Sequence, residues 1–207
     1  MDNLEKIREI SKDYMKKLSD PAHNWHHIQR VYNLCERIGK EEGADLEVLR
    51  IGALLHDIGL TENREKHGEV GAKMAEDILK DLDYSKKSIK HVKDMIKSHR
   101  FSNNHEPKTL EAYILRDADR LDAMGAVGIA RIMAYNGLHN KEIYDPDKEI
   151  NDEYDGYSET AIHHFYEKLL KLKEDLKTAT ARKIGRERHE YMEKYLERFF
   201  DEWEGKR

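Results

Sequence analysis

The chain has 207 residues, 38% of them charged, with 42 acidic side chains against 37 Lys and Arg. A net charge of −5 lacks the basic excess that neutralises nucleic-acid phosphates, so we expect no stable nucleic-acid partner. One Cys excludes an internal disulfide framework, and the longest stretch without Asp, Glu, Lys or Arg, Ile132 to Asn140, is about half of the ~18 residues a membrane span needs. No apolar signal segment follows Met1, so a cytoplasmic protein without a membrane partner is expected.

Apolar residues recur at spacings of three and four along most of the chain, and only three prolines interrupt them. This period predicts an all-α protein. The expected helices are Leu4 to Leu18, Pro21 or a few residues later to Gly39, Asp45 to His56, Lys66 to Leu79, Ser85 to His99, Leu110 to Ala134, Ala161 to Leu176 and Thr180 to Trp203. We expect Asp20 to cap the second of these, and the long sixth helix to bend or break near Gly125 or Gly128.

Residues 136–158 interrupt the helical pattern, because they are rich in Gly, Asn, Asp and Tyr and have no sustained period. A segment of this length predicts a lid or a surface loop. No repeat or linker divides the chain, so we expect a single domain, 1–207, with a core at about 20–135 and C-terminal helices at about 159–204. Aromatic residues of the last helix spread wider than one core stripe, and they either cover the bundle or form the seam of a homodimer.

Several His and Asp residues stand where solvent is expected to be excluded. His27 lies on the apolar face of the second helix, and the adjacent pair His56 and Asp57 ends the most apolar one. Asp119 and Asp122 are three residues apart on a later helix. Taken singly, each is more often a hydrogen-bonded core residue, a cap or an ion-pair partner. A buried carboxylate costs several kcal/mol unless it is paired or metal-bound, so the four-part pattern favours a divalent cation.

A His, an adjacent His-Asp pair and a distant Asp resemble the signature of the HD superfamily of metal-dependent phosphohydrolases. The sequence looks most similar to a bacterial subgroup that includes nucleoside triphosphate pyrophosphohydrolases. The segments that carry this similarity are Ala22 to His27, Leu55 to Ile58, Asp117 to Ala123, Gly128 to Arg131 and His164 to Leu170. The resemblance implies a compact HD-type helical bundle with additional C-terminal helices. The ligands it implies are His27, His56, Asp57 and Asp119.

The segment after the His-Asp pair departs from that subgroup, whose members tend to carry an acid and a Lys there. Glu62 and Lys66 are the candidates for these two roles. His67 instead resembles the broader HD group, in which a His at this place approaches the substrate or a second metal. His99, on the apolar stripe of the fifth helix, is a comparable candidate.

The ligand set indicates a mechanism. Two imidazoles and two carboxylates without a thiolate favour Mn²⁺, with Mg²⁺, Co²⁺, Ni²⁺ and Fe²⁺ as alternatives, over a structural zinc ion. Such an ion acidifies a bound water and polarises a phosphoryl oxygen, which requires no covalent intermediate. Asp122 is the candidate to accept or orient the water's proton, with Glu62 as the alternative; an ion pair with a neighbouring Arg is the ordinary interpretation of Asp122.

Phosphate groups also need cationic or hydrogen-bonding partners from the protein. The candidates that the resemblance places around the metal are Lys66, His67, His99 and Arg131, and His23 is a candidate to touch the substrate or to orient His27 or Asp57. The expected substrate is a small phosphorylated molecule, and the preferred reaction converts a (deoxy)nucleoside triphosphate to monophosphate and diphosphate. An HD-type phosphomonoesterase or nucleotidase, a cyclic phosphodiesterase and a non-catalytic nucleotide-binding module are the alternatives.

Overall fold

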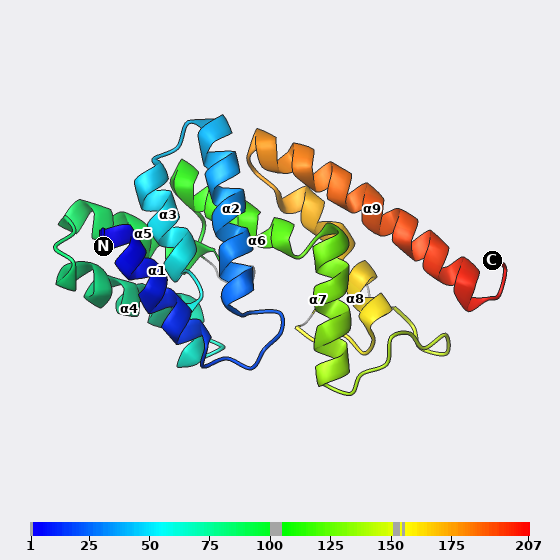
Figure 1. Cartoon of the computed structure of the whole chain (residues 1–207). Helices are drawn as coiled ribbons and strands as arrows, with labels where there is room; N and C mark the ends of the chain where they lie inside the picture. The colour runs from blue at the N-terminus through cyan, green and yellow to red at the C-terminus, as the bar shows by residue number, and fades with distance from the viewer. Residues whose placement is uncertain (1, 100–104, 151–153, 155) are drawn as a thin grey trace. The chain divides into compact units, whose positions relative to one another are not determined.

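The computed structural model describes residues 2–99, 105–150, 154 and 156–207, and within these ranges it contains helices and no strand. The elements, coloured in chain order in Figure 1, are α1 (Asn3–Met15), α2 (Trp25–Glu42), α3 (Leu46–Leu55), η1 (Ile58–Thr61), α4 (His67–Asp81), α5 (Lys86–Ser98), α6 (Leu110–Asp122), α7 (Gly125–Leu138), α8 (Ala161–Glu167), η2 (Leu169–Asp175) and α9 (Ala179–Trp203). The predicted all-α class is confirmed. Among the described helices, none is both long and apolar enough to cross a membrane.

Packing divides the chain into two compact units, one ending at Asp119 and one running from Arg120 to Arg207. In the first unit, α3 contacts α1, α2 and α5, and α4 packs on α5 and η1. The sequence of α3 explains its central place, because every residue from Ile51 to Leu55 is buried. The single-domain organisation expected from the sequence stays a prediction.

The helix α2 begins at Trp25, a few residues after Pro21 as one of the two expected starts has it, but its cap differs from the expected one. Asn24, and not Asp20, caps the helix, since its side-chain oxygen accepts hydrogen bonds from the N–H groups of His26 and His27 at 3.0 and 3.2 Å. Asp20 lies four residues earlier and accepts from the N–H of Ala22 at 2.8 Å. The cap therefore places the first turn of α2, and with it His27, directly.

A close approach of two backbones joins η1 to α4. A Cβ atom built on Gly59 would lie 2.1 Å from the carbonyl oxygen of His67 and 2.6 Å from the nitrogen of Gly71. Real Cβ atoms never come so close to backbone atoms, so only glycine allows this contact. Gly59, inside η1, is thus a packing position that sets the start of α4.

In the second unit, α9 contacts α7 and η2, and α8 contacts α7 and η2. The expected break near Gly125 is confirmed: α6 ends at Asp122, and Gly125 begins α7 with a positive φ of 71°. The continuous helix expected from Ala161 to Leu176 is wrong, because α8 ends at Glu167 and 3₁₀ turns follow. Leu169 and Leu172, three residues apart, share one face of a 3₁₀ helix, and both are buried.

The segment between α7 and α8 is tied to the elements around it, where the structure describes it. Lys141 donates a hydrogen bond to the carbonyl of Ser158 at 2.7 Å, and the first N–H groups of α8 bond to the carbonyls of Glu142 and Ile143. Tyr144 packs at 5.3 Å from the rings of both Phe200 and Trp203. Residues 151–153 and 155 of the expected lid or loop lie outside the described residues, and both the lid and the homodimer stay predictions.

Candidate metal centre

Side chains from four parts of the first unit meet around Asp57. His27 comes from the first turn of α2, His56 from the residue after α3, and Asp57 from the residue before η1. The Nε2 atom of His27 lies 3.3 Å from Nε2 of His56 and 3.4 Å from Oδ2 of Asp57. Asp119 on α6 adds a carboxylate oxygen 3.5 Å from the same nitrogen. The structure thus brings together all four residues that the resemblance assigns as ligands.

The other oxygen of Asp57 faces a second pair of imidazoles. Oδ1 lies 3.3 Å from Nε2 of His99, at the end of α5, and 3.8 Å from Nε2 of His67, the first residue of α4. His67 and His99 were the candidates that the sequence tied to the substrate or to a second metal. The structure places both beside the ligand Asp57.

Backbone carbonyls set the orientation of three of these rings. Nδ1 of His56 donates to the carbonyl of Ala53 at 2.9 Å, and Nδ1 of His99 donates to that of Ile96 at 2.6 Å. Nδ1 of His67 likewise donates to the carbonyl of Arg64 at 2.8 Å. Because a carbonyl can only accept, Nδ1 must carry the proton, and each Nε2 is left toward the cluster. This is the arrangement usual for imidazoles that bind a metal.

Charge states within the cluster suit metal binding. Burial lowers the pKa of His56 to about 4, so its ring is neutral and its Nε2 is a free electron-pair donor. For Asp57, burial opposes ionisation, but His56 beside it and hydrogen bonds from His27 and His99 hold the carboxyl pKa well below its ordinary value. A neutral imidazole and an ionised carboxylate are the forms in which these side chains act as ligands.

The donor set fits a divalent ion. The donor atoms of His27, His56 and Asp57 lie within 4.8 Å of one another, and so do those of Asp57, His67 and His99. Ligands bonded to one ion at about 2.0–2.4 Å lie roughly 3 Å apart, close to the separations seen here. Burying carboxylate oxygens against the bare Nε2 of His56 is costly unless a cation lies between them. The cluster is therefore a site for a divalent metal ion.

The remaining candidates have varied surroundings. His23 packs its ring edge-on against His27, with centroids 5.6 Å apart. Glu62 and Lys66 are exposed, and within the described residues no hydrogen bond or ion pair joins either to the cluster. Asp122 and Arg131 belong to the second unit, where they form an ion pair of 2.8 Å. The Arg partner expected for Asp122 is thus found, although it is Arg131 and not a residue of its own helix.

Sequence reasoning missed the surroundings of His23. Its Nδ1 lies 3.0 Å from Oδ2 of Asp20, and the same oxygen accepts a hydrogen bond from the guanidinium of Arg64. Arg64 is 44 residues from Asp20, on the segment between η1 and α4. No period or motif connects two such loops, so nothing in the sequence pointed to this contact.

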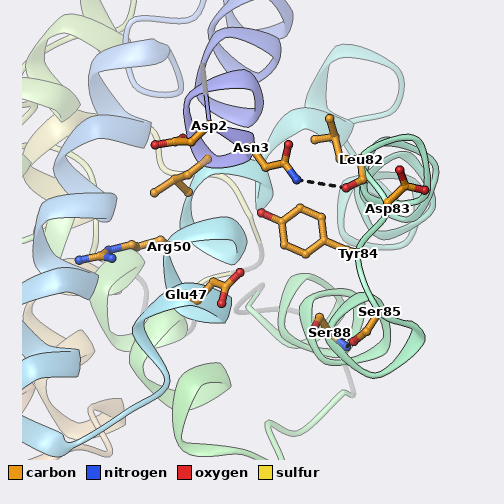
Figure 2. Close-up of a pocket in the computed structure, with 10 residues that line it drawn as sticks. Asp2, Asn3, Glu47, Arg50, Leu82, Asp83, Tyr84, Ser85 and Ser88 are labelled. Carbon is orange, nitrogen blue, oxygen red and sulfur yellow. Dashed lines mark hydrogen bonds between the residues drawn. The ribbon is translucent and has the colours of Figure 1, made fainter.

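A separate pocket of about 540 Å³ opens between the start of α1, the start of α3 and the turn from α4 to α5, as Figure 2 shows. Its lining includes Asp2, Glu47 and Asp83, together with Arg50 and Tyr84. Arg50 forms an ion pair with Glu36. A hydrogen bond from the side chain of Asn3 to the carbonyl of Leu82 joins two of the lining segments. No residue of the metal cluster lines this pocket, so the two features are distinct.

Comparison with known proteins agrees with this site. Residues 24–124 match the HD domain family. The chain is 32% identical over 202 residues to the uncharacterized protein YpgQ of Bacillus subtilis, covering 95% of this chain and 93% of that one. The crystal structure of YpgQ in complex with ADP superposes with a TM-score of 0.78 at 29% identity, over 98% of both chains. An HD-superfamily hydrolase from Bacillus thuringiensis gives 0.79 at 35% identity, over 98% of this chain and 97% of that one.

The chain therefore belongs to the HD superfamily. The buried His/Asp cluster at the place of the superfamily's signature makes it, by class, a metal-dependent hydrolase.

Proposed function

We propose that this protein is a phosphohydrolase that cleaves a (deoxy)nucleoside triphosphate to monophosphate and diphosphate. The observation that carries the proposal is the buried cluster, in which the donor atoms of His27, His56 and Asp57 lie within 4.8 Å of one another and the His56 ring is neutral. The nucleotide part draws support from the relative YpgQ, whose structure was determined with ADP. The charge balance of the chain, without a basic excess, also suits a small substrate better than a polymeric one.

In this proposal His27, His56, Asp57 and Asp119 hold the ion, and Mn²⁺ is the preferred one. A divalent ion bound there supplies a Lewis acid for water and for a phosphoryl oxygen. The protein's own part is positional. The carbonyls of Ala53 and Ile96 hold the rings of His56 and His99, so that no reorientation is needed when substrate binds.

The remaining roles are assigned to flanking residues. His67 and His99, on the Oδ1 side of Asp57, are the proposed contacts for phosphate oxygens, with Lys66 and Arg131 as further cationic partners and His23 beside His27. Asp122 is the proposed proton acceptor. Its carboxylate pairs with Arg131 at 2.8 Å. Glu62 is the alternative.

A nucleotide panel tests the proposal. Purified protein with Mn²⁺ is incubated with nucleoside tri-, di- and monophosphates, and products are separated by ion-exchange chromatography. We expect diphosphate and monophosphate in equal amounts from a triphosphate. Release of orthophosphate alone, or turnover of monophosphates only, would contradict the proposed reaction.

Asp57→Ala is the matched variant, with Asp13→Ala as control because Asp13 is an exposed acid on α1 paired only with Lys16. We expect Asp57→Ala to lose both bound metal, measured by elemental analysis, and activity. Asp13→Ala should retain both. Metal binding without turnover of any phosphorylated compound would instead indicate a non-catalytic nucleotide-binding module.

A phosphomonoesterase or cyclic phosphodiesterase of the same superfamily is the second candidate. It is favoured by one observation: the two oxygens of Asp57 serve two donor groups, which suits a pair of ions bridged by one carboxylate. Two ions per chain in elemental analysis, reduced to one by His99→Ala, together with turnover of a cyclic nucleotide, would select this candidate over the first.

A further inference from the structure

The loop that precedes α2 is organised around the carboxylate of Asp20. One oxygen of Asp20 accepts from the N–H of Ala22 at 2.8 Å, and the other accepts from Nδ1 of His23 at 3.0 Å and from the guanidinium of Arg64. The side chain of Asp20 is only 10% exposed although it stands in a loop. Burial opposes its ionisation, but the hydrogen bond from His23, the N–H of Ala22 and Arg64 hold its pKa well below the ordinary value. Asp20 is therefore a fixed acceptor with three donors.

These contacts determine how the His23 ring is presented. Because the Asp20 carboxylate can only accept a hydrogen bond, Nδ1 of His23 must carry the proton that it donates. Among the described residues no further hydrogen bond holds the ring. The ring also packs edge-on against His27, with 5.6 Å between centroids and 75° between planes. The orientation of His23 thus depends on Asp20, and His23 in turn lies against a proposed metal ligand.

Arg64 connects this loop to His67 at the start of α4. Its side chain binds Asp20, ahead of α2, while its own carbonyl accepts from Nδ1 of His67, at the start of α4. Arg64 lies between Asp57 and His67 in the chain, and its side chain is 61% exposed. An exposed Arg on such a segment contributes little to folding stability, since a surface ion pair is worth about 0–1 kcal/mol. Its place suggests a role in alignment.

We propose that Asp20 and Arg64 are positioning residues of the metal centre, which hold the His23 ring in the Nδ1–H form against His27 and thereby align His27 for the ion. Neither side chain touches the ion or the substrate in this arrangement. The effect on turnover rests on the proposed function, whereas the effects on the His23 ring and on metal affinity do not. Outer residues that orient metal-binding imidazoles typically change metal affinity or activity 10–100-fold.

The experiment compares Asp20→Ala, Asp20→Asn, Arg64→Ala and Arg64→Lys in the full chain. Arg37→Ala serves as control, because Arg37 is an equally exposed Arg that pairs with an exposed acid, Glu41, on α2. Three quantities are measured: the tautomer of His23 from long-range ¹H–¹⁵N spectra of the metal-free protein, the Kd for Mn²⁺ by competition with a chelating dye, and kcat and KM where a substrate is turned over.

We expect Asp20→Ala to shift His23 away from the Nδ1–H tautomer and to weaken Mn²⁺ binding by roughly 10-fold, the lower end of the range for such residues. Arg64→Ala should weaken it about 2–3-fold, and less at high salt, because the Arg64 side chain is exposed and salt screens its charge. Asp20→Asn keeps an acceptor and Arg64→Lys keeps the charge, so both should restore most of the loss. Arg37→Ala should match the wild type, and kcat should fall more than KM rises.

The proposal is overturned if folded Asp20→Ala retains the wild-type His23 tautomer and Mn²⁺ affinity, or if Arg37→Ala has the same effect as Arg64→Ala. If Asp20→Ala does not fold, Arg64→Ala decides by the same two measurements, and a Kd for Mn²⁺ equal to that of Arg37→Ala overturns the proposal. Both measurements are made without substrate. A protein that turns over no nucleotide therefore fails the proposed function and can still support or exclude this role of Asp20 and Arg64.

Discussion

Asp57 has a different task on each of its two oxygens. Oδ2 lies near His27 and His56, and Oδ1 lies near His67 and His99. A rotation of this one carboxyl group would disturb both sides of the cluster at once. We therefore expect small displacements of the backbone next to Asp57 to affect the whole site. A substitution at Gly59, two residues from Asp57, tests this expectation.

Gly59→Ala tests this backbone contact. A Cβ at Gly59 collides with backbone atoms of His67 and Gly71, which cannot rotate away. We expect a loss of roughly 1–3 kcal/mol in the free energy of unfolding, as for other overpacked sites, measured by urea denaturation. Because His67 starts α4 at the collision point, metal affinity should fall as well.

Gly137→Ala is the control for that change. Gly137 lies within α7, and a Cβ there meets nothing within 4 Å. The substitution should stabilise the protein by about 0.5–1 kcal/mol, because Ala is the better helix former. Equal stabilities of the two variants would show that the close approach of η1 and α4 is not a constraint.

At the scale of single residues, the sequence predicted the residues that share a helical period or a motif. His27, His56, Asp57 and Asp119 were found from their order and spacing, and His67 and His99 from the resemblance. Asp20 was assigned a cap that Asn24 makes instead. Arg64 was not singled out, because its partners come from a distant loop and from its own backbone carbonyl, neither of which leaves a pattern in the sequence.

At the scale of the elements, helix ends position the imidazoles. His56 and His99 each follow the last residue of a helix and donate to the carbonyl three residues earlier, one of the carbonyls that a helix end leaves without a partner. Hydrophobic periodicity predicted α3 and α5 well, and hence these two positions. It could not predict that α8 ends at Glu167, since a spacing of three suits a 3₁₀ helix as well as an α-helix.

His164 on α8 predicts a pH dependence of stability. Burial, together with the nearby charges of Lys168 and Lys141, lowers the pKa of His164 to about 3, while a His in the unfolded chain titrates near ~6.5. The unfolded state therefore binds more protons between these values. Stability contributed by the neutral ring is complete above pH ~6.5 and is lost as the pH falls toward 3.

Comparison with His164→Asn isolates this contribution. The oxygen of Ser158 donates its proton to Glu167, so it must accept from Nδ1 of His164, and an Asn amide can donate in the same place. Between pH 7.5 and 5 the wild type should lose about 1–2 kcal/mol more than the variant in urea denaturation. Parallel pH profiles of the two proteins would contradict a neutral, buried His164.

At the scale of the whole molecule, the two units differ in what they contain. The clusters of donor atoms found among the described residues lie in the first unit, which ends at Asp119. The second unit contains the ion pair of Asp122 and Arg131 and the hydrogen-bonded group of Lys141, Ser158 and Glu167. All-α architecture and the place of the site were predictable from the sequence. The division into units was not, because no linker or change in composition marks it.

Metal binding should be visible as stability of the whole chain. A ligand present at 100 times its Kd stabilises the folded state by about 2.7 kcal/mol, which corresponds to roughly 5–10 °C in Tm for a protein of this size. We expect this rise when Mn²⁺ is added to protein treated with a chelator, in a thermal scan followed by circular dichroism. Asp57→Ala should show no rise, and Asp13→Ala should behave as the wild type; a rise in Asp57→Ala would place the ion elsewhere.

The acceptors that orient His56, His67 and His99 are all main-chain carbonyls, at Ala53, Arg64 and Ile96. No substitution at these three positions removes the accepting atom. The accepting atom at each of these positions therefore does not depend on which side chain stands there. A search for the metal centre by side-chain identity alone detects the ligands and overlooks the backbone carbonyls that orient them. The short motif by which such proteins are recognised therefore understates how much of the chain is needed to build the metal centre.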